Sequence, residues 1–223
     1  MDNKYLINQY INTGMGIPKE QYDMLSGSDK KSYLRTMLIR IKQDARYVNY
    51  YYGELTEDIQ LAVVTQNGIL IHYILEKGIT PSEEVQLAAV KQYGYAIRFI
   101  IAKGITPSEA VQLAAVTQNG HAIQYIIDKG IKPSEAVQLA AVTQNGSVIE
   151  YIIKKGITPS ERVQLAAVTQ NGHAIQYILN NGITPSEQVQ LAAVTKYGFA
   201  IEHILKKGII PSERVKVIAK QNK

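Results

Sequence analysis

Hydrophobic and polar positions repeat along most of the chain with a period of 26 residues. The clearest markers of the period are prolines, and six of them follow one another at this spacing: Pro81, Pro107, Pro133, Pro159, Pro185 and Pro211. Most of these prolines open the pattern Pro-Ser-Glu-x-Val-Gln-Leu-Ala-Ala-Val, which is usually followed by Thr-Gln-Asn-Gly-x-Ala-Ile-x-Tyr-Ile. Self-similarity at a period of roughly 20–50 residues is typical of solenoid proteins.

One unit, 104–129, shows why each period predicts two short helices. Thr106, Pro107 and Glu109 have the spacing of a capping box, with threonine at the N-cap, proline at the first helical position and glutamate at the third. We expect Gly120 to end this helix as a left-handed C-cap residue and Gly130 to end the second helix. Apolar residues lie four apart in both segments, whereas the alternation typical of a strand is missing.

Helices of about ten residues are marginal on their own in water. One pair also cannot bury its own apolar face, so neighbouring pairs must stack on one another. We therefore predict an all-α fold, a right-handed α-solenoid of HEAT-like two-helix repeats with a helical N-terminal cap. The expected regions are a helical capping region at 1–51, six 26-residue repeats at 52–207 and a half-repeat cap at 208–223.

The capping region differs from the repeats in composition. Residues 18–25 echo the start of a repeat and predict a short helix, and Ser28 and Asp29 are expected to cap a longer one. Eight of the fifteen tyrosines gather here: Tyr5, Tyr10, Tyr22, Tyr33, Tyr47, Tyr50, Tyr51 and Tyr52. They favour a cap that shields the open end of a stack. A docking surface is the alternative, since tyrosine is enriched at interfaces.

The charge distribution and the absence of cysteine exclude several classes of function. The formal net charge is +5 and there is no cysteine, which excludes disulfides and thiolate chemistry. Residues 1–52 carry eight Lys/Arg against five Asp/Glu, residues 53–201 ten against twelve, and residues 202–223 six against two. The near-neutral middle lacks the continuous basic stripe that non-specific nucleic-acid binding needs. No signal peptide or membrane-spanning segment is evident, so we expect a cytoplasmic protein without a membrane partner.

The repeated segment Pro-Ser-Glu-x-Val-Gln-Leu-Ala-Ala-Val-x-Gln-Asn-Gly-x-Ala-Ile-x-Tyr-Ile resembles short two-helix repeats of bacterial and phage proteins of unknown function. Those repeats are similar to compact HEAT and leucine-rich-variant repeats. The resemblance covers about residues 53–215 and implies the solenoid architecture. It implies no catalytic residues, and residues 1–52 do not share it.

No pattern in the sequence predicts catalysis, a metal site or a cofactor. His121 and His173 occupy the same repeat position two units apart, which places them roughly 20 Å from each other, too far to share a metal. His72 and His203 are likewise interpreted as surface residues. The recurring Glu is explained by helix capping, and no glycine-rich phosphate loop is present. We therefore expect a protein that is not an enzyme.

Two positions of the second helix vary between repeats whose scaffold is nearly constant. The first row is Ile69, Tyr95, His121, Ser147, His173 and Phe199, and the second, three residues later, is His72, Arg98, Gln124, Glu150, Gln176 and Glu202. A spacing of three puts both rows on one helix face. Tyr93 and Tyr197 also replace the usual Asn beside Tyr95 and Phe199.

Because second helices of helical solenoids often line the concave face, these rows predict a partner-binding surface. The predicted residues are Tyr93, Tyr95, Arg98, His121, Gln124, Ser147, Glu150, His173, Gln176, Tyr197, Phe199 and Glu202. Variation at tolerant exposed sites is the alternative interpretation.

Two constant rows have competing interpretations. The first is Gln60, Gln86, Gln112, Gln138, Gln164 and Gln190, which either bonds neighbouring units or loop carbonyls, or lines a polar groove for a ligand backbone. The second is Tyr73, Phe99, Tyr125, Tyr151, Tyr177 and His203, which is expected to pack between units.

Two functions follow from these observations. The first is a non-enzymatic protein-binding repeat scaffold, with a phage or mobile-element inhibitor or adaptor that binds a host protein as its narrower form. The alternative is a nucleic-acid-binding HEAT-like protein that uses its basic termini together with arginine and tyrosine residues.

Overall fold

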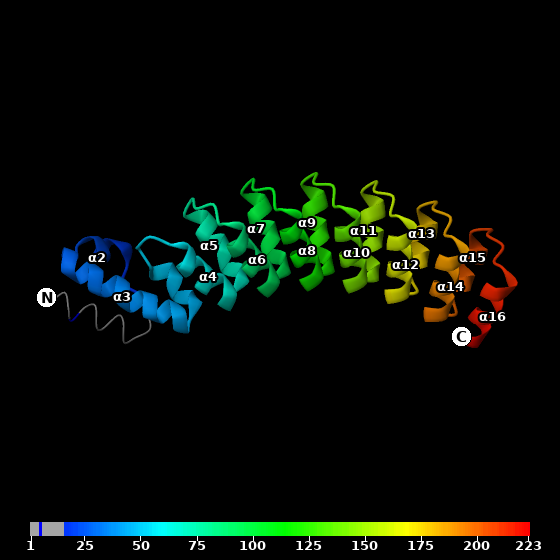
Figure 1. Ribbon diagram of the computed structural model, residues 1–223, viewed down its shortest axis with the longest axis horizontal. Helices are drawn as coiled ribbons and strands as arrows, with labels where there is room; N and C mark the ends of the chain where they lie inside the picture. The colour runs from blue at the N-terminus through cyan, green and yellow to red at the C-terminus, as the bar shows by residue number, and fades with distance from the viewer. Residues whose placement is uncertain (1–4, 6–15) are drawn as a thin grey trace. The chain divides into compact units, whose positions relative to one another are not determined.

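The computed structural model describes Tyr5 and residues 16–223, and the regular elements of these residues are all helices. The α-solenoid of helical hairpins predicted from the repeat is confirmed (Figure 1). The chain forms two compact units, Met1–Ile100 and Ile101–Lys223. Of the predicted tyrosine set, Tyr10 lies outside the described residues.

The first unit contains a short N-terminal helical region and the first two-helix repeats. Its elements are α2 (Lys19–Asp23), α3 (Gly27–Gln43), the 3-10 helix η1 (Ala45–Tyr50), α4 (Glu57–Gln66), η2 (Gly68–Leu70), α5 (Ile71–Glu76), α6 (Glu83–Gln92), η3 (Gly94–Ala96) and the start of α7 (Ile97–Ala102). The long helix predicted near Ser28 is therefore present, but its cap is Ser26, whose Oγ accepts a hydrogen bond from the Asp29 amide at 3.2 Å.

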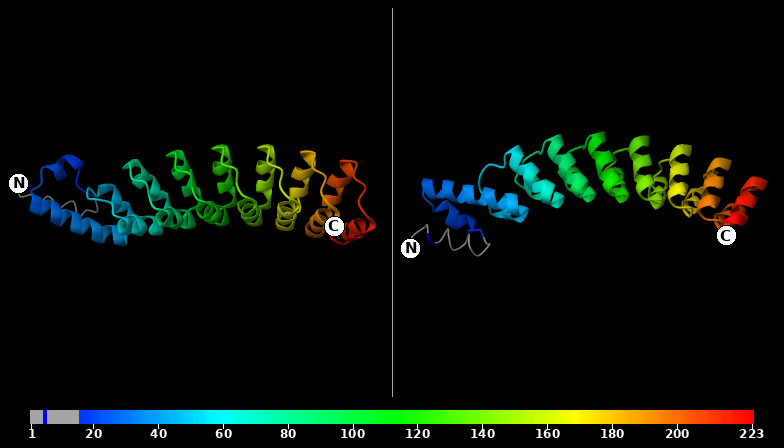
Figure 2. Two further views of the ribbon diagram at one scale, coloured as in Figure 1. Left: turned by 45° about the horizontal axis from the view of Figure 1, so that its top comes forward. Right: turned by 60° about the horizontal axis from the view of Figure 1, so that its bottom comes forward.

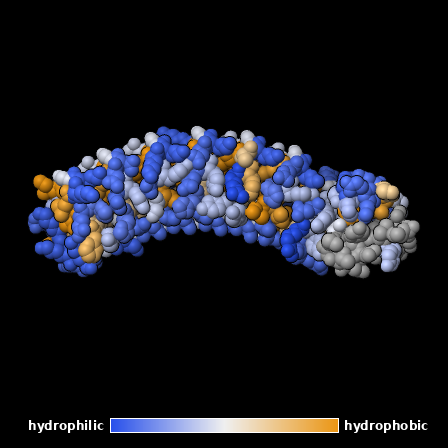
Figure 3. Space-filling view, turned by 180° about the vertical axis from the view of Figure 1, so that it is seen from behind, coloured by the Kyte–Doolittle hydropathy of each residue, from blue (hydrophilic) through white to orange (hydrophobic). Residues whose placement is uncertain are grey.

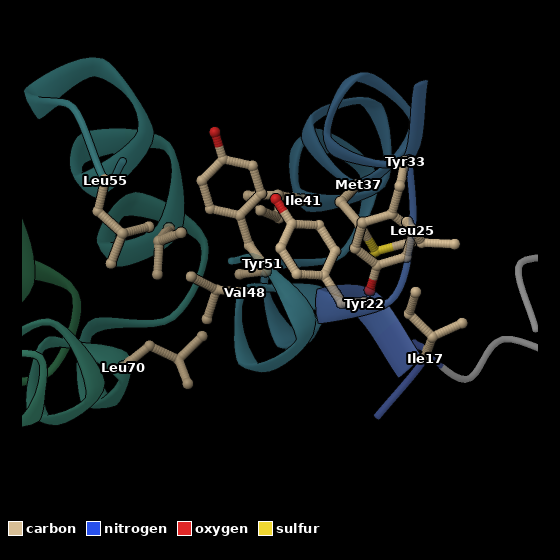
Figure 4. Close-up of a cluster of buried hydrophobic side chains, with 12 residues drawn as sticks. Ile17, Tyr22, Leu25, Tyr33, Met37, Ile41, Val48, Tyr51, Leu55 and Leu70 are labelled. Atoms are coloured by element: carbon tan, nitrogen blue, oxygen red, sulfur yellow. The ribbon is translucent and has the colours of Figure 1, made fainter. Parts of the chain in front are cut away.

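Aromatic side chains hold the N-terminal region together. Tyr22, Tyr33 and Tyr51 are buried in one cluster with aliphatic residues, which Leu55 and Leu70 reach from the first repeat (Figure 4). The Tyr33 hydroxyl donates to the Tyr50 carbonyl at 2.8 Å, so this buried phenol has a partner. Several tyrosines of the region are thus core residues, as a capping role requires.

The second unit contains five further first helices, each followed by a second helix except the last. Its elements are α8 (Glu109–Gln118), η4 (Gly120–Ala122), α9 (Ile123–Asp128), α10 (Glu135–Gln144), η5 (Gly146–Val148), α11 (Ile149–Lys154), α12 (Glu161–Gln170), α13 (Ala174–Asn180), α14 (Glu187–Lys196), α15 (Ala200–Lys206) and α16 (Glu213–Gln221). First helices lie beside first helices and second helices beside second helices, which gives two rows (Figure 2).

The core of each repeat uses the same positions. In α8 they are Val111, Ala115 and Val116, and in α9 they include Ile123 and Ile126, all with no exposed surface. Burying a side chain the size of isoleucine contributes about 1.5–3 kcal/mol. The alanine lets adjacent first helices approach closely.

The start of each first helix differs from the predicted capping box. Helix α8 begins at Glu109, and its N-cap is Ser108, whose Oγ accepts from the Val111 amide at 3.3 Å. Thr106 is therefore not the cap, and Pro107 precedes the helix instead of occupying its first turn. The reason is that the buried Gln112 amide donates to the Pro107 carbonyl at 3.0 Å, which keeps that carbonyl out of the helix.

The two glycines of a repeat have different roles. Gly130 has a φ of +76°, as predicted for a left-handed helix end. Two backbone hydrogen bonds close this end: Gly130 N donates to Ile127 O at 2.8 Å, and Ile131 N donates to Ile126 O at 3.2 Å. The prediction for Gly120 is wrong, because its φ is not positive. A Cβ at Gly120 would lie 2.6 Å from the Ala141 carbonyl oxygen, so glycine is needed for the close approach of the next repeat.

Polar bonds between consecutive repeats set their register. The Gln144 side chain accepts from the Gly120 amide at 2.8 Å, and Gln170 does the same for Gly146 at 2.7 Å. The Glu at the first helical position accepts from the Ser cap of the next repeat, as in Ser212 to Glu187 at 2.5 Å. The predicted capping-box role of this Glu is therefore wrong, since its partner belongs to the following repeat.

Helix α16 differs from the other first helices at positions that are buried in the repeats. Lys216 replaces the buried glutamine, and Lys220 replaces a valine that has no exposed surface in the repeats, such as Val194. Lys220 is exposed. Leu205 and Ile210 are exposed by 53% and 89%, and hydrophobic surface is visible at this end of the chain (Figure 3).

Candidate functional site

The two variable rows lie at the start of the second helix of each repeat. Their first members occupy the 3-10 turn or the N-cap position, as His121 in η4 and His173 before α13 show. They therefore lie one or two residues before the observed start of the second α-helix, although they are predicted to belong to that helix. Their second members, such as Gln124 and Gln176, lie within the helix.

Residues of the first row connect neighbouring repeats in the second unit. The Asn145 side-chain nitrogen lies 3.0 Å from His121 Nε2, and Asn171 donates to Ser147 Oγ at 2.9 Å. In both cases the partner is the asparagine of the next repeat. These residues therefore belong to the contact between repeats as well as to the surface.

The same contact becomes aromatic where tyrosine replaces asparagine. The rings of His173 and Tyr197 lie 4.0 Å apart, and Tyr197 lies 5.7 Å from Phe199 between ring centroids. The Lys223 ammonium lies 5.1 Å from the Phe199 ring centroid. An aromatic patch thus forms at the last full repeat, as the Tyr197 and Phe199 substitutions predict.

In the first unit, the predicted residues form a separate small cluster. The rings of Tyr93 and Tyr95 meet edge to face, with centroids 5.8 Å apart. The exposed guanidinium of Arg98 lies 4.5 Å above the Phe99 ring, a distance that suits a cation–π interaction. Phe99 also contacts His72, with the ring centroids 5.5 Å apart.

Members of the second row differ in their partners. The Gln124 amide lies 3.3 Å from His121 Nδ1, and Glu150 forms an ion pair with Lys154 at 2.7 Å. Glu202 pairs with Lys223 at 3.2 Å. All twelve predicted residues are exposed or half-buried, and the most exposed aromatic among them is Phe199 at 41%.

The predicted partner-binding surface does not lie on a concave face in the second unit. Within Ile101–Lys223 the stack bends toward the first helices α8, α10, α12 and α14, so the second helices lie on its outer side (Figure 1). The expectation that second helices line a concave face is therefore wrong for this unit. Its first-helix edge is largely hydrophilic on the face that Figure 3 shows.

The constant glutamines are structural. In each repeat the side-chain nitrogen donates to the carbonyl five residues earlier, as Gln138 does to Pro133 at 3.1 Å. These glutamines are buried, with 7–9% exposure, and Gln138 is among the residues that line a cavity of about 570 Å³. The loop-carbonyl interpretation is confirmed, although the carbonyl belongs to the same repeat.

The constant aromatic row, from Tyr73 to His203, is half-buried, and at least one of its members is hydrogen-bonded to a neighbouring repeat. The Tyr151 hydroxyl donates to Asp128 of the preceding repeat, and Lys155 pairs with the same carboxylate at 2.8 Å. These bonds, led by that from Lys155, hold the pKa of Asp128 below its ordinary value. We call Asp128, Tyr151 and Lys155 the Asp128 cluster.

The residues that join the repeats are not identifiable from the sequence pattern alone. Gln92, Gln144 and Gln170 bond a glycine of the preceding repeat, and Glu57, Glu135 and Glu161 each bond a serine 25 residues later. Their constancy at one repeat position was the available signal, but it does not show which partner lies across the interface.

The described residues contain no group of three or more His, Asp or Glu side chains that could hold a metal ion. None of their helices combines the length and the apolar character that a bilayer crossing demands. A comparison with models of protein families finds no match for the chain, and a comparison with curated proteins also finds no match.

Proposed function

We propose that the chain is a non-enzymatic scaffold that binds another protein. The observation that supports this proposal is the contrast between a constant core and a varied surface. Positions such as Val111 and Ala115 repeat with no exposed surface, whereas the twelve predicted binding residues are exposed or half-buried and differ between repeats.

The residue types of the varied surface suit protein recognition. Tyr, Phe and Arg contribute most to binding at protein interfaces, and the rows contain Tyr95, Arg98 and Phe199. Hydrogen bonds between repeats hold His121 and Ser147 in place. A surface that is ordered before binding loses less conformational entropy when the partner docks.

A narrower form of the proposal is an inhibitor or adaptor of phage or mobile-element origin that binds a host protein. Its support is the resemblance of the 26-residue unit to repeats of bacterial and phage proteins. The scaffold proposal does not depend on it.

The test is affinity capture with the intact chain and two surface variants. Arg98→Ala with Tyr95→Ala, and Phe199→Ala with Glu202→Ala, remove the exposed groups of the two aromatic clusters. We expect at least one pair to reduce recovery of a stoichiometric protein about tenfold or more, because interface anchors carry most of the binding free energy.

A matched control is Gln188→Ala with Thr195→Ala, two exposed positions on α14. This variant should recover the partner like the intact chain, and all variants should keep the same far-ultraviolet circular dichroism. Capture of no stoichiometric protein would refute the scaffold function. Recovery of nucleic acid at 50 mM salt in place of a protein would favour the alternative function.

A further inference from the structure

A cleft of about 310 Å³ lies where the carboxyl ends of α13 and α15 meet. Six residues line it: Gln176, Leu179, Asn180, His203, Lys206 and Lys207. We call this the His203 cleft. Five of the six side chains are polar, and the two lysines are exposed and therefore accessible to a ligand.

The Asp128 cluster occupies the same repeat positions two repeats earlier. Asn180, His203 and Lys207 lie 52 residues after Asp128, Tyr151 and Lys155, respectively. In the earlier set, the Asp128 carboxylate accepts from the Tyr151 hydroxyl and pairs with Lys155 at 2.8 Å. The repeat geometry therefore brings these three positions together around a negatively charged oxygen.

The later set keeps the positive charge and loses the negative charge. Asn180 replaces Asp128, so Lys207 has no carboxylate at the equivalent position. Lys206 also lacks the partner of its equivalent, because Lys154 pairs with Glu150 whereas Glu202 pairs with Lys223. Among the described residues, neither Lys206 nor Lys207 has an ion pair.

The other polar groups at the cleft also suit an anion. The side chains of Gln176 and Asn180 carry N–H donors, and His203 offers a ring nitrogen. Burial lowers the pKa of His203, and His173 and Lys206 lower it further by repulsion, whereas Glu202 raises it. The ring is thus predominantly neutral at pH 7.5, and the two lysines supply about two positive charges.

We propose that the His203 cleft binds a phosphate dianion, which takes the place that the Asp128 carboxylate has in the earlier repeat. Phosphate carries about −1.5 to −2 charge near neutral pH, which matches Lys206 and Lys207. The oxygens accept from the lysine ammonium groups and the amides of Asn180 and Gln176. The phosphate group is either free or carried by a phosphorylated side chain. This inference is independent of the proposed protein-binding function.

The test is a titration of the intact chain with inorganic phosphate at pH 7.5, at constant ionic strength maintained with chloride. The readout is the imidazole resonance of His203, assigned with the His203→Gln variant. We expect a saturable shift and a rise in the pKa of His203, because a bound anion stabilises the protonated ring.

Three variants distinguish phosphate binding in the His203 cleft from a general effect of positive charge. Lys206→Gln with Lys207→Gln should weaken binding about tenfold or more, because charge-assisted hydrogen bonds are lost. Asn180→Asp should also abolish binding, because it restores the carboxylate of the earlier repeat beside Lys207. Lys154→Gln with Lys155→Gln is the matched control, since these equivalent lysines already have partners, and it should bind like the intact chain.

A second arm identifies the source of the phosphate group. A short peptide with one phosphoserine is compared with its unphosphorylated form and with inorganic phosphate. Tighter binding of the phosphopeptide assigns the cleft to a phosphorylated protein, and equal binding of peptide and phosphate assigns it to a small phosphate compound. No saturable shift, or an equal loss in the two lysine double variants, would overturn the proposal.

Discussion

The α9–α11 and α13–α15 junctions share one backbone arrangement but present different surface chemistry. At the first, Asp128 is paired with Lys155 and bonded by Tyr151. At the second, Asn180, His203 and Lys207 occupy the equivalent positions and line a cleft. At these positions the junctions differ by Asp to Asn and Tyr to His, and the ion pair of the first junction is absent from the second. A repeat scaffold can therefore change its surface without changing its core.

The two junctions share one backbone because the core beneath them is the same. Placing a charge in that core is the change with the largest expected effect on stability. Val142 of α10 has no exposed surface, whereas its equivalent in α16 is the exposed Lys220. We expect Val142→Lys to lower the free energy of unfolding by about 3–5 kcal/mol, because it leaves an unpaired buried charge. Urea denaturation followed by circular dichroism measures the change, and Lys220→Val is the control. An unchanged midpoint for Val142→Lys would contradict the repeat register.

The close approach between repeats gives the next largest effect. A Cβ at Gly146 would lie 2.4 Å from the Ala167 carbonyl oxygen, so Gly146→Ala should cost about 1–3 kcal/mol of unfolding free energy through forced displacement. Gly156 has open space around it but a φ of +79°, so Gly156→Ala should cost about 1 kcal/mol from backbone strain alone. Thermal melts of the two variants separate contact from conformation. The reverse order would show that the repeats are further apart.

Removal of the Asp128 carboxylate should give the α9–α11 junction some of the anion affinity proposed for the α13–α15 junction. In Asp128→Asn, Lys155 and Tyr151 lose their carboxylate, while Lys154 keeps Glu150. We therefore expect this variant to acquire a phosphate site about tenfold weaker than that of the His203 cleft, because only one lysine is released. Resonances of Tyr151 in a phosphate titration report it. Absence of the new site, with the His203 cleft still binding, would mean that residues beyond these positions are needed.

The smallest effect concerns pH. Because the folded chain lowers the pKa of His203, chiefly by burial, the unfolded chain binds more protons below about pH 6.5. This contribution to stability is present above that pH and decreases as the pH falls toward the folded pKa. His203→Gln should therefore flatten the acid side of the curve of unfolding free energy against pH by a small amount, since the side chain is half-exposed. Equal slopes between pH 5 and 7 would show that the ring is fully solvated.

Much of the fold was accessible from the pattern of residues because the pattern is local. The 26-residue period, the paired helices and the left-handed Gly130 follow from spacing and from the conformations that glycine allows. Each of these features depends on residues within one unit, so neighbours along the chain are sufficient to specify it.

The candidate binding surface could be predicted only in part from the sequence. Variation between repeats identified residues that are exposed or half-buried, but not that His121 and Ser147 contact the next repeat. From the sequence, His203 was interpreted as a surface residue and as a member of the constant aromatic row. The cleft at His203 depends on what stands at Asn180 and Lys207, and these positions become neighbours only when second helices stack.

The amino-acid order alone specified a helical array, its period and the glycines that end its second helices, since short-range sterics and helix periodicity decide these features. Folding in three dimensions decided that Ser108 caps α8, that Gly120 makes room for a carbonyl and that Glu109 bonds a serine of the next repeat. It also decided which surface lysines keep a partner. The physical reason is that hydrogen bonds, contacts and ion pairs between residues some 25 positions apart exist only after adjacent repeats have come together.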